Sequence, residues 1–293
     1  VSSISHDSLL RYEEIVRLVR LMQPLGVQKV RITGGEPMAR RGCLDLVQNL
    51  HEMGGLSRIA MTTNALLLRG RMQEARDKGL TSINISLDTL DPVCYRQMTR
   101  LGNVAPVLDA IDEALTCGLS VKVNAVPVRG MNENDLVSVA ALAQDQPVCV
   151  RFIELMPIGQ GKEKHTLKEA EVKHILSETY GTIRPCVEKL GSGPAHYMEI
   201  DGFEGKIGFI SAISHKFCSG CNRVRMTADG FLKPCLQYET GMDLRTMLRD
   251  GVSDAELKAQ IEMTITQKPK CHHFGEINEP EWTEHRGMSE IGG

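Results

Sequence analysis

Apolar residues recur at helical spacing early in the chain, and each such run is followed by a short apolar stretch typical of a β-strand. The first run ends at Pro24 and Gly26, and residues 27–32 follow it as an expected strand. This order of helix and strand repeats as far as about residue 157. The apolar positions of the first expected helix are Tyr12, Ile15, Val16, Val19 and Met22.

The later repeats predict helices over residues 44–50, 107–115 and 136–143. They predict strands over residues 59–61, 83–86, 121–126 and 149–155. Helices that alternate with strands form parallel βα units, so we expect an α/β fold that is either an open doubly wound sheet or a complete or partial barrel.

After Pro157 the alternation stops. A helix is expected over residues 167–180, and the sequence from Gly191 onward is rich in glycine and poor in strand signals. We therefore expect a core over residues 1–157 and a second region over residues 158–293.

The composition is that of a folded globular protein, with 42% hydrophobic and 24% charged residues. The formal net charge of -3 excludes a broad basic surface for nucleic acid. No apolar run approaches the roughly 20 residues that span a bilayer, and no signal peptide is evident. We expect a cytoplasmic protein with neither a nucleic acid nor a membrane as partner.

Polar and glycine residues gather where the expected strands end, which is the edge that carries function in parallel α/β folds. Any one of them could simply cap the next helix. They are Arg31 and Gly34-Gly35-Glu36, Thr62 and Asn64, Ser86 and Asp88, Lys122 and Asn124, and Glu154 and Met156.

Three of the nine cysteines, Cys218, Cys221 and Cys235, form a C-x2-C-x13-C set. Thiolates at this spacing suit both zinc and an iron–sulfur cluster. Zinc would need a fourth ligand, which His215 or the group over residues 271–273 could supply. For a cluster, three thiolates would leave one iron open. The residues alone leave these two readings near parity.

Arg223 and Arg225 follow Cys221 at alternate positions of an extended segment, so their guanidinium groups project to one side and suit phosphate oxygens. Away from the cysteines, such a pair would be read as solvated surface arginines. The glycine-rich exit of the first strand, Thr33-Gly34-Gly35-Glu36-Pro37, lets a ligand approach the backbone. It matches neither the Walker loop nor the dinucleotide fingerprint.

Together these motifs resemble a known family. The chain is similar from end to end to the GTP 3',8-cyclases of molybdenum cofactor (molybdopterin) biosynthesis, which belong to the radical S-adenosylmethionine (SAM) superfamily. The similarity rests on Gly34-Gly35-Glu36-Pro37, Thr62-Thr63-Asn64, Ser86-Leu87-Asp88, Lys122-Val123-Asn124, Glu154-Leu155-Met156 and the C-x2-C-N-R-V-R-x8-P-C stretch that begins at Cys218.

The resemblance implies a partial (β/α) barrel of the radical SAM type, with its first strand missing and a C-terminal cluster-binding extension. It implies a lyase that converts GTP to 3',8-cyclo-7,8-dihydro-GTP by a 5'-deoxyadenosyl radical. It also implies roles for single residues. SAM would contact Gly34, Gly35, Glu36, Ser86 and Met156, and GTP would contact Arg31, Thr62, Lys122, Arg223, Val224 and Arg225. A [4Fe-4S] cluster would be held by Cys218, Cys221 and Cys235. The tail residues Gly292 and Gly293 would reach the catalytic site.

Two features depart from the family pattern. Residues 1–293 contain no C-x3-C-x2-C motif, so we expect the second [4Fe-4S] cluster, which generates the radical, only in a complete protein. Ala65 stands where the family places glycine after Thr-Thr-Asn. As written, the chain is expected to bind GTP without cleaving SAM.

Other functions remain open at this point. The chain could be a non-catalytic GTP-binding fragment or subunit that lacks the radical-generating cluster, or a structural zinc module. It could also be a radical enzyme acting on a peptide, although Arg223 and Arg225 argue against that. The resemblance further implies cyclic pyranopterin monophosphate synthase as the downstream enzyme, and it allows a homodimer.

Overall fold

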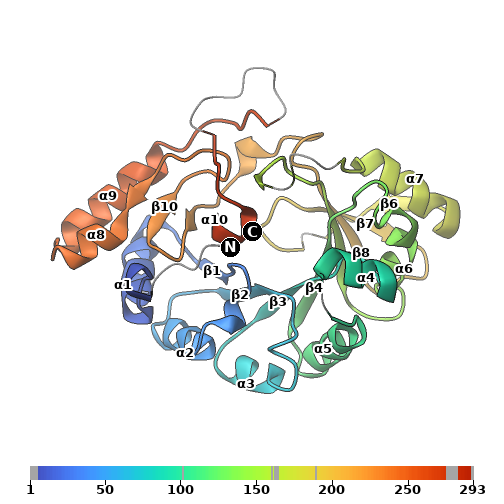
Figure 1. The fold of residues 1–293 in the computed structure, drawn as a ribbon, viewed down its shortest axis with the longest axis horizontal. Coiled ribbons are helices and arrows are strands. Elements are labelled where there is room, and N and C mark those ends of the chain that lie inside the picture. The colour runs from blue at the N-terminus through green and yellow to red at the C-terminus, as the bar shows by residue number, and fades with distance from the viewer. Residues whose placement is uncertain are drawn as a thin grey trace.

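The computed structural model describes residues 6–100, 102–159, 161, 165–188, 190–274 and 283–291. An eight-stranded sheet, ordered β1-β2-β3-β4-β5-β8-β7-β6, curves around the centre of the molecule (Figure 1). Strands β1 to β5 and β8 run parallel, and β6 and β7 are antiparallel. The strands are β1 (Lys29–Ile32), β2 (Arg58–Thr63), β3 (Ser82–Ser86), β4 (Ser120–Ala125), β5 (Cys149–Ile153), β6 (Ile183–Pro185), β7 (His196–Ile200) and β8 (Lys206–Ile210).

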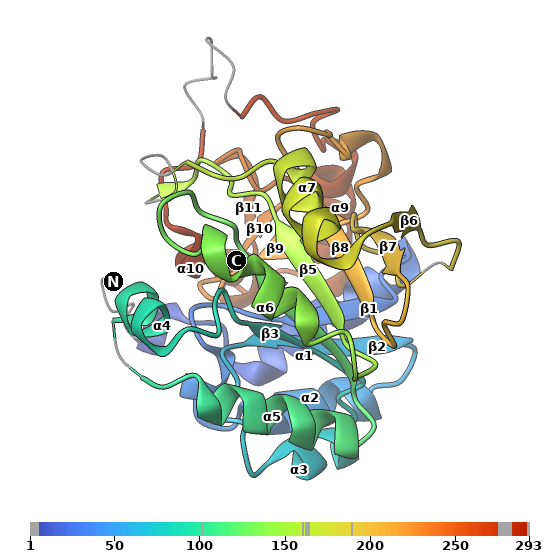
Figure 2. The ribbon, with the colours of Figure 1, turned by 90° about the vertical axis from the view of Figure 1, so that its right-hand side faces the viewer.

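Helices α2, α3 and α5 form a layer on the outer, convex side of this sheet (Figure 2). Helices α2 to α6 connect successive parallel strands, as βα units require. The helices are α1 (Tyr12–Met22), α2 (Cys43–Glu52), α3 (Met72–Asp77), α4 (Pro92–Thr99), α5 (Ala105–Thr116), α6 (Leu136–Ala141), α7 (Glu169–Tyr180), α8 (Leu244–Arg249), α9 (Asp254–Thr266) and α10 (Met288–Ile291).

The two faces of the sheet differ in polarity. Met61, Ile83 and Val123 face the helices and have no exposed surface, within one continuous apolar core. The alternate residues face inward and are polar, because successive side chains of a strand point to opposite faces. Thr62, Asn84 and Lys122 share one level of the register, and Ser86, Asn124 and Arg151 share the next.

A second, smaller core joins the start of the chain to its C-terminal half. Leu18 of α1 packs there with Leu232, Leu257 and Ile261. Leu232 belongs to a three-stranded antiparallel sheet of β9 (Arg225–Met226), β10 (Phe231–Lys233) and β11 (Met242–Asp243). This core holds β9, which begins at Arg225, beside the open edge of the main sheet.

The parallel βα units expected up to residue 157 are confirmed, and the expected helix over residues 167–180 is α7. The expectation of few strands after Gly191 was wrong, because β7 and β8 lie there and β8 continues the parallel sheet beside β5. Between β5 and β8 the chain forms the antiparallel strands β6 and β7. The alternation of one helix with one strand is therefore not visible in this part of the sequence. A boundary at residue 157 stays a prediction.

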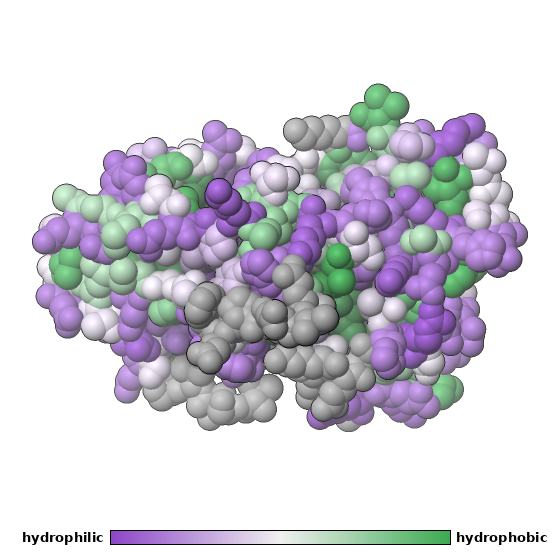
Figure 3. Space-filling model, turned by 90° about the horizontal axis from the view of Figure 1, so that it is seen from above, coloured by the Kyte–Doolittle hydropathy of each residue, from purple (hydrophilic) through white to green (hydrophobic). Residues whose placement is uncertain are grey.

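The molecule is mostly hydrophilic on the face seen in Figure 3, with apolar residues scattered between polar ones. Within the described ranges, no helix combines the length and the apolar character needed to cross a bilayer.

Gly208 on β8 leaves room for two side chains of the inner face. A Cβ atom there would lie 2.9 Å from both Arg151 Cγ and Tyr197 Cε1. We predict that Gly208→Ala lowers the free energy of unfolding by about 1–3 kcal/mol, because a well-packed site cannot accept the methyl group without shifting its neighbours. Urea unfolding measures the change. Gly193→Ala is the control, since a Cβ there meets nothing within 4 Å; equal effects of the two variants would contradict the prediction.

Candidate active site

The exits of β1 and β2 are joined by one carboxylate. Glu36 accepts hydrogen bonds from the Thr63 hydroxyl (2.7 Å), the Asn64 backbone N–H (2.8 Å) and the Met38 backbone N–H (3.1 Å). Gly34 has φ 149°, and a Cβ there would meet nothing within 4 Å, so its surroundings are open. The glycine-rich loop is thus fixed by Glu36 and open beside Gly34.

The other residues expected to contact SAM stand at neighbouring strand ends. Ser86 is the exposed last residue of β3. Met156 follows β5 and packs against the small apolar cluster of Ile158, Phe274 and Ile291. Met156 therefore contacts the side of the molecule where α10 lies, whereas the Gly34–Glu36 loop and Ser86 lie at the exits of β1 and β3.

Four arginines from three segments interact electrostatically on the concave side of the sheet. Arg31 lies on β1 and Arg151 on β5, while Arg223 precedes β9 and Arg225 begins it. After burial, the charges that act most strongly on Arg31 are those of the other three, and together these causes lower the pKa of Arg31 to about 10. Burial and then Arg223 lower the pKa of Arg225 to about 10 as well.

Arg31 and Arg225 stay charged at neutral pH, because these two pKa values lie well above 7. Their mutual repulsion in a partly desolvated space makes an anion at this position favourable. Arg31 is accessible to solvent, so an anion could reach it from the concave side.

Polar side chains of the inner face hold Arg151 in place. Its Nε and Nη2 donate to Asn124 Oδ1 (2.9 and 2.5 Å), and Nη2 also donates to Asn84 Oδ1 (2.8 Å). Asn84 in turn donates to the Thr62 hydroxyl (3.2 Å). Arg151 is 5% exposed, and its desolvation lowers its pKa. These bonds extend the site from the expected Thr62 on β2 to a buried arginine three strands away on β5.

Lys122 is buried beside the same group. Its ammonium donates to the Tyr197 hydroxyl (3.0 Å) and to the Leu190 carbonyl (3.1 Å). Tyr197 also interacts with Arg151 and Arg31. Lys122 thus adds a fifth positive charge at the deeper level of the barrel, with two of its three N–H donors in use. Val224, by contrast, packs its side chain on the second core.

The cysteines of the C-x2-C pair lie on one tight turn beside Arg223. The Cys221 thiol accepts from Lys268 Nζ (3.2 Å) and Arg223 Nη2 (3.7 Å), and Cys218 Sγ accepts from the His272 backbone N–H (3.4 Å). Burial alone would raise the pKa of Cys221, but the Arg223 backbone N–H and the charges of Arg223 and Lys268 lower it. Cys235 interacts electrostatically with Arg225.

Each of these three cysteines has a free thiol. In the described part of the chain, no group of three or more His, Cys, Asp or Glu residues could hold a single metal ion. His272, one of the residues considered for zinc, has its ring nitrogens against the Ala212 carbonyl (2.8 Å) and the Phe274 N–H (3.4 Å).

A buried ion pair attaches the C-terminal segment to β10. Lys233 and Glu284 are both fully buried and paired, and Glu284 also accepts from Arg286 Nε (3.0 Å) and Nη2 (3.1 Å). The segment leads to α10, which lies inside the arc of strands (Figure 1). Gly292 and Gly293 lie outside the described residues, so their expected catalytic role stays a prediction.

Comparison with known proteins identifies the family. The model of the Radical SAM superfamily matches residues 2–143, and that of Molybdenum Cofactor Synthesis C matches residues 148–274. A GTP 3',8-cyclase of Clostridium perfringens (strain 13) is 40% identical over 99% of this chain and 89% of its own length. That of Pelotomaculum thermopropionicum is 41% identical over 100% of this chain and 90% of its own length. The chain belongs to the GTP 3',8-cyclase family.

This result confirms the resemblance and the radical SAM type of α/β fold expected from the motifs. The superfamily implies SAM and a [4Fe-4S] cluster as cofactors. Among solved structures, Streptococcus suis SuiB aligns over 58% of this chain and 39% of its own, with 18% identity and a TM-score of 0.48.

Three residues of this GTP 3',8-cyclase family member were missed by the motif analysis: Arg151, Tyr197 and Lys268. The sequence did point to Arg151 as a site residue, because a charged residue in the middle of an apolar strand must face something polar. Tyr197 had none, since the strand that carries it was not expected. Lys268 lies 47 positions from the cysteine it contacts, and nothing local links the two.

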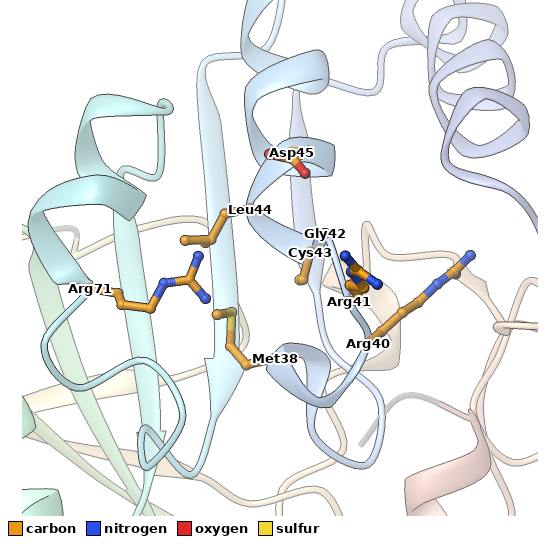
Figure 4. A pocket seen from close by; sticks show the side chains of 8 residues that line it. All are labelled: Met38, Arg40, Arg41, Gly42, Cys43, Leu44, Asp45 and Arg71. Atoms are coloured by element: carbon orange, nitrogen blue, oxygen red, sulfur yellow. The ribbon is translucent and has the colours of Figure 1, made fainter.

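A separate cavity of about 300 Å³ lies beside α2, lined by Arg40, Arg41 and Arg71 among others (Figure 4). Two of these arginines have other partners. Arg40 donates to the Leu10 carbonyl and lies over the Tyr12 ring, and Arg71 pairs with Glu74. These contacts make the cavity a weaker candidate for an anion than the concave face of the sheet.

The buried Glu284 leads to a testable prediction. Glu284→Gln leaves the Lys233 ammonium buried without its counter-charge, which in comparable pairs costs about 3–5 kcal/mol. We predict faster amide hydrogen exchange over residues 283–291, with exchange in β3 little changed. Exposed Glu262 on α9 provides the control variant Glu262→Gln. Unchanged exchange over residues 283–291 would show that the ion pair does not hold this segment.

Proposed function

We propose that the protein is a GTP 3',8-cyclase that acts in molybdenum cofactor biosynthesis and converts GTP to 3',8-cyclo-7,8-dihydro-GTP. The observation that carries this proposal is the convergence of Arg31, Arg151, Arg223 and Arg225 on the concave face of the sheet. Such a group suits a polyphosphate, because each guanidinium can make two parallel hydrogen bonds to phosphate oxygens.

In this proposal the arginines bind the triphosphate, and the repulsion among them is relieved when it arrives. Lys122 keeps one N–H free of the two bonds described above, and Thr62 offers its hydroxyl beside Asn84. Both stand deeper in the barrel than the strand exits. The contact of Val224 with the substrate would come from its backbone, because its side chain belongs to the second core.

Cys218, Cys221 and Cys235 would hold a [4Fe-4S] cluster. The donor set fits such a group, since the thiols are free, two of them share one turn, and N–H donors already point at Cys218 and Cys221. The donors would compensate the negative charge of the thiolates. Three ligands would leave one iron open toward the guanine.

SAM would be held at the strand exits by the Gly34–Gly35 backbone, Ser86 and Met156, with Glu36 keeping the loop in position. When bound with a reduced cluster, SAM would supply the 5'-deoxyadenosyl radical that the conversion of GTP requires. The residues of the chain must then hold both molecules close together and keep water away. We also propose that the product passes to cyclic pyranopterin monophosphate synthase.

Anaerobic incubation of the full-length protein with GTP, SAM and a reductant tests the activity. We predict that 5'-deoxyadenosine and the cyclised nucleotide form in equal amounts, measured by liquid chromatography with mass detection. Absence of both products would overturn the proposal. Binding of GTP with neither product would favour a non-catalytic GTP-binding protein instead.

The arginine group makes a separate prediction for binding. Arg31→Met removes one charge-assisted contact to phosphate, worth about 1.5–3 kcal/mol, so the affinity for GTP falls roughly tenfold or more. Calorimetry measures the affinity, and the loss should shrink at high salt because counterions screen the charge. Arg20→Met on the exposed side of α1 is the control. Equal affinities of the two variants would place the triphosphate elsewhere.

A further inference from the structure

Lys268 joins the cysteine turn to the arginine arm. Its Nζ donates to the Cys221 thiol at 3.2 Å and to the Arg223 backbone carbonyl at 2.5 Å. Arg223 itself returns to Cys221 through Nη2 at 3.7 Å. One ammonium group thus fixes both a thiol of the expected cluster and the backbone that carries the first arginine of the pair.

The position of Lys268 is well defined by its surroundings. It lies two residues after Thr266, the last residue of α9, whose Leu257 and Ile261 are buried in the second core. Its backbone N–H donates to the Ile265 carbonyl (3.2 Å), and Pro269 restricts its backbone to extended conformations. The negative end of the α9 dipole also favours a positive charge here.

We propose that Lys268 is a positioning residue that sets the electrostatics of the C-terminal cluster and orients Arg223 toward the triphosphate. The inference rests on the proposed function and adds to it a residue outside the cysteine and arginine motifs. Hydrogen bonds to ligating sulfurs are among the factors that set the reduction potential of an iron–sulfur cluster. A cation beside Cys221 stabilises the reduced, more negative form.

The Lys268 ammonium would link cluster binding at Cys221 to phosphate binding at Arg223. Because Lys268 holds the Arg223 carbonyl, its loss would leave the backbone between Cys221 and Arg225 less constrained. The guanidinium of Arg223 would then be less ordered before phosphate binds. Ordering it would cost part of the free energy of binding. This effect needs no cluster, so it can be measured separately.

The test uses the chain with Lys268→Met, which removes the charge and the donor but keeps an unbranched side chain. Lys270→Met is the matched control, because Lys270 is exposed two positions away and its loss changes the net charge equally. Lys268→Arg restores the charge. The first readout is the midpoint potential of the cluster reconstituted with iron and sulfide, followed by electron paramagnetic resonance. The second is the affinity of the cluster-free chain for GTP by calorimetry.

We expect Lys268→Met to lower the midpoint potential by an amount equal to about a tenfold change in the reduction equilibrium, or about 59 mV for one electron. We expect its affinity for GTP to fall roughly fivefold, as a modest ordering cost predicts. Lys268→Arg should recover most of the potential, and Lys270→Met should match the parent in both measurements.

A potential and an affinity for Lys268→Met equal to those of Lys270→Met would overturn the proposal. If the parent chain takes up no iron, the cluster assignment fails and the proposal fails with it. If the parent holds the cluster but does not bind GTP, the proposed substrate is wrong, while the potential still decides whether Lys268 acts on the cluster. A misfolded Lys268→Met would be recognised by its melting curve. The midpoint potential and the GTP affinity of Lys268→Arg, compared with those of the parent, would then decide whether Lys268 has the proposed role.

Discussion

The opposite polarity of the two faces of the sheet is the constraint on which the site depends. Met61, Ile83 and Val123 are fully buried beneath the helices, and each such side chain contributes about 1.5–3 kcal/mol to stability. This apolar face anchors the sheet on the helix layer. The inner face is therefore free to carry charged groups that would destabilise an ordinary core.

The inner face still has to accommodate Arg151, a charge that is almost completely removed from water. It does so with neutral acceptors, Asn84 and Asn124, and with the hydroxyl of Tyr197, while Gly208 leaves the space that these side chains need. A carboxylate in the same place would neutralise the guanidinium and compete with an incoming anion. Amide oxygens orient the guanidinium without cancelling its charge, so the attraction for phosphate is retained.

The sequence predicts the parts of this structure whose signals are local. The helix and strand alternation, the cysteine set and the arginine pair each lie within a short stretch, and the order of the motifs identifies the family. The path after residue 157 could not be predicted, because β8 joins β5 only through tertiary pairing, in which Lys206 lies opposite Cys149, 57 positions earlier in the chain. Ala65 shows another limit: it has φ 66° and is fully buried, so packing around it overrides the ordinary preference for glycine.

The site is completed by segments that are distant in sequence, and each of them is attached through a charged side chain. Lys268 reaches the Arg223 carbonyl from the end of α9, and Glu284 connects Lys233 on β10 to the segment that leads to α10. The Cys218–Cys221 turn and the two arginines lie on one continuous stretch, so whatever moves the thiols also moves the guanidinium groups. Cluster and triphosphate binding would then be coupled through a few bonds of shared backbone. In such an arrangement the second half of the chain would support both the cluster and the triphosphate. The parallel strands of the first half would supply the surface that the cluster and the triphosphate face.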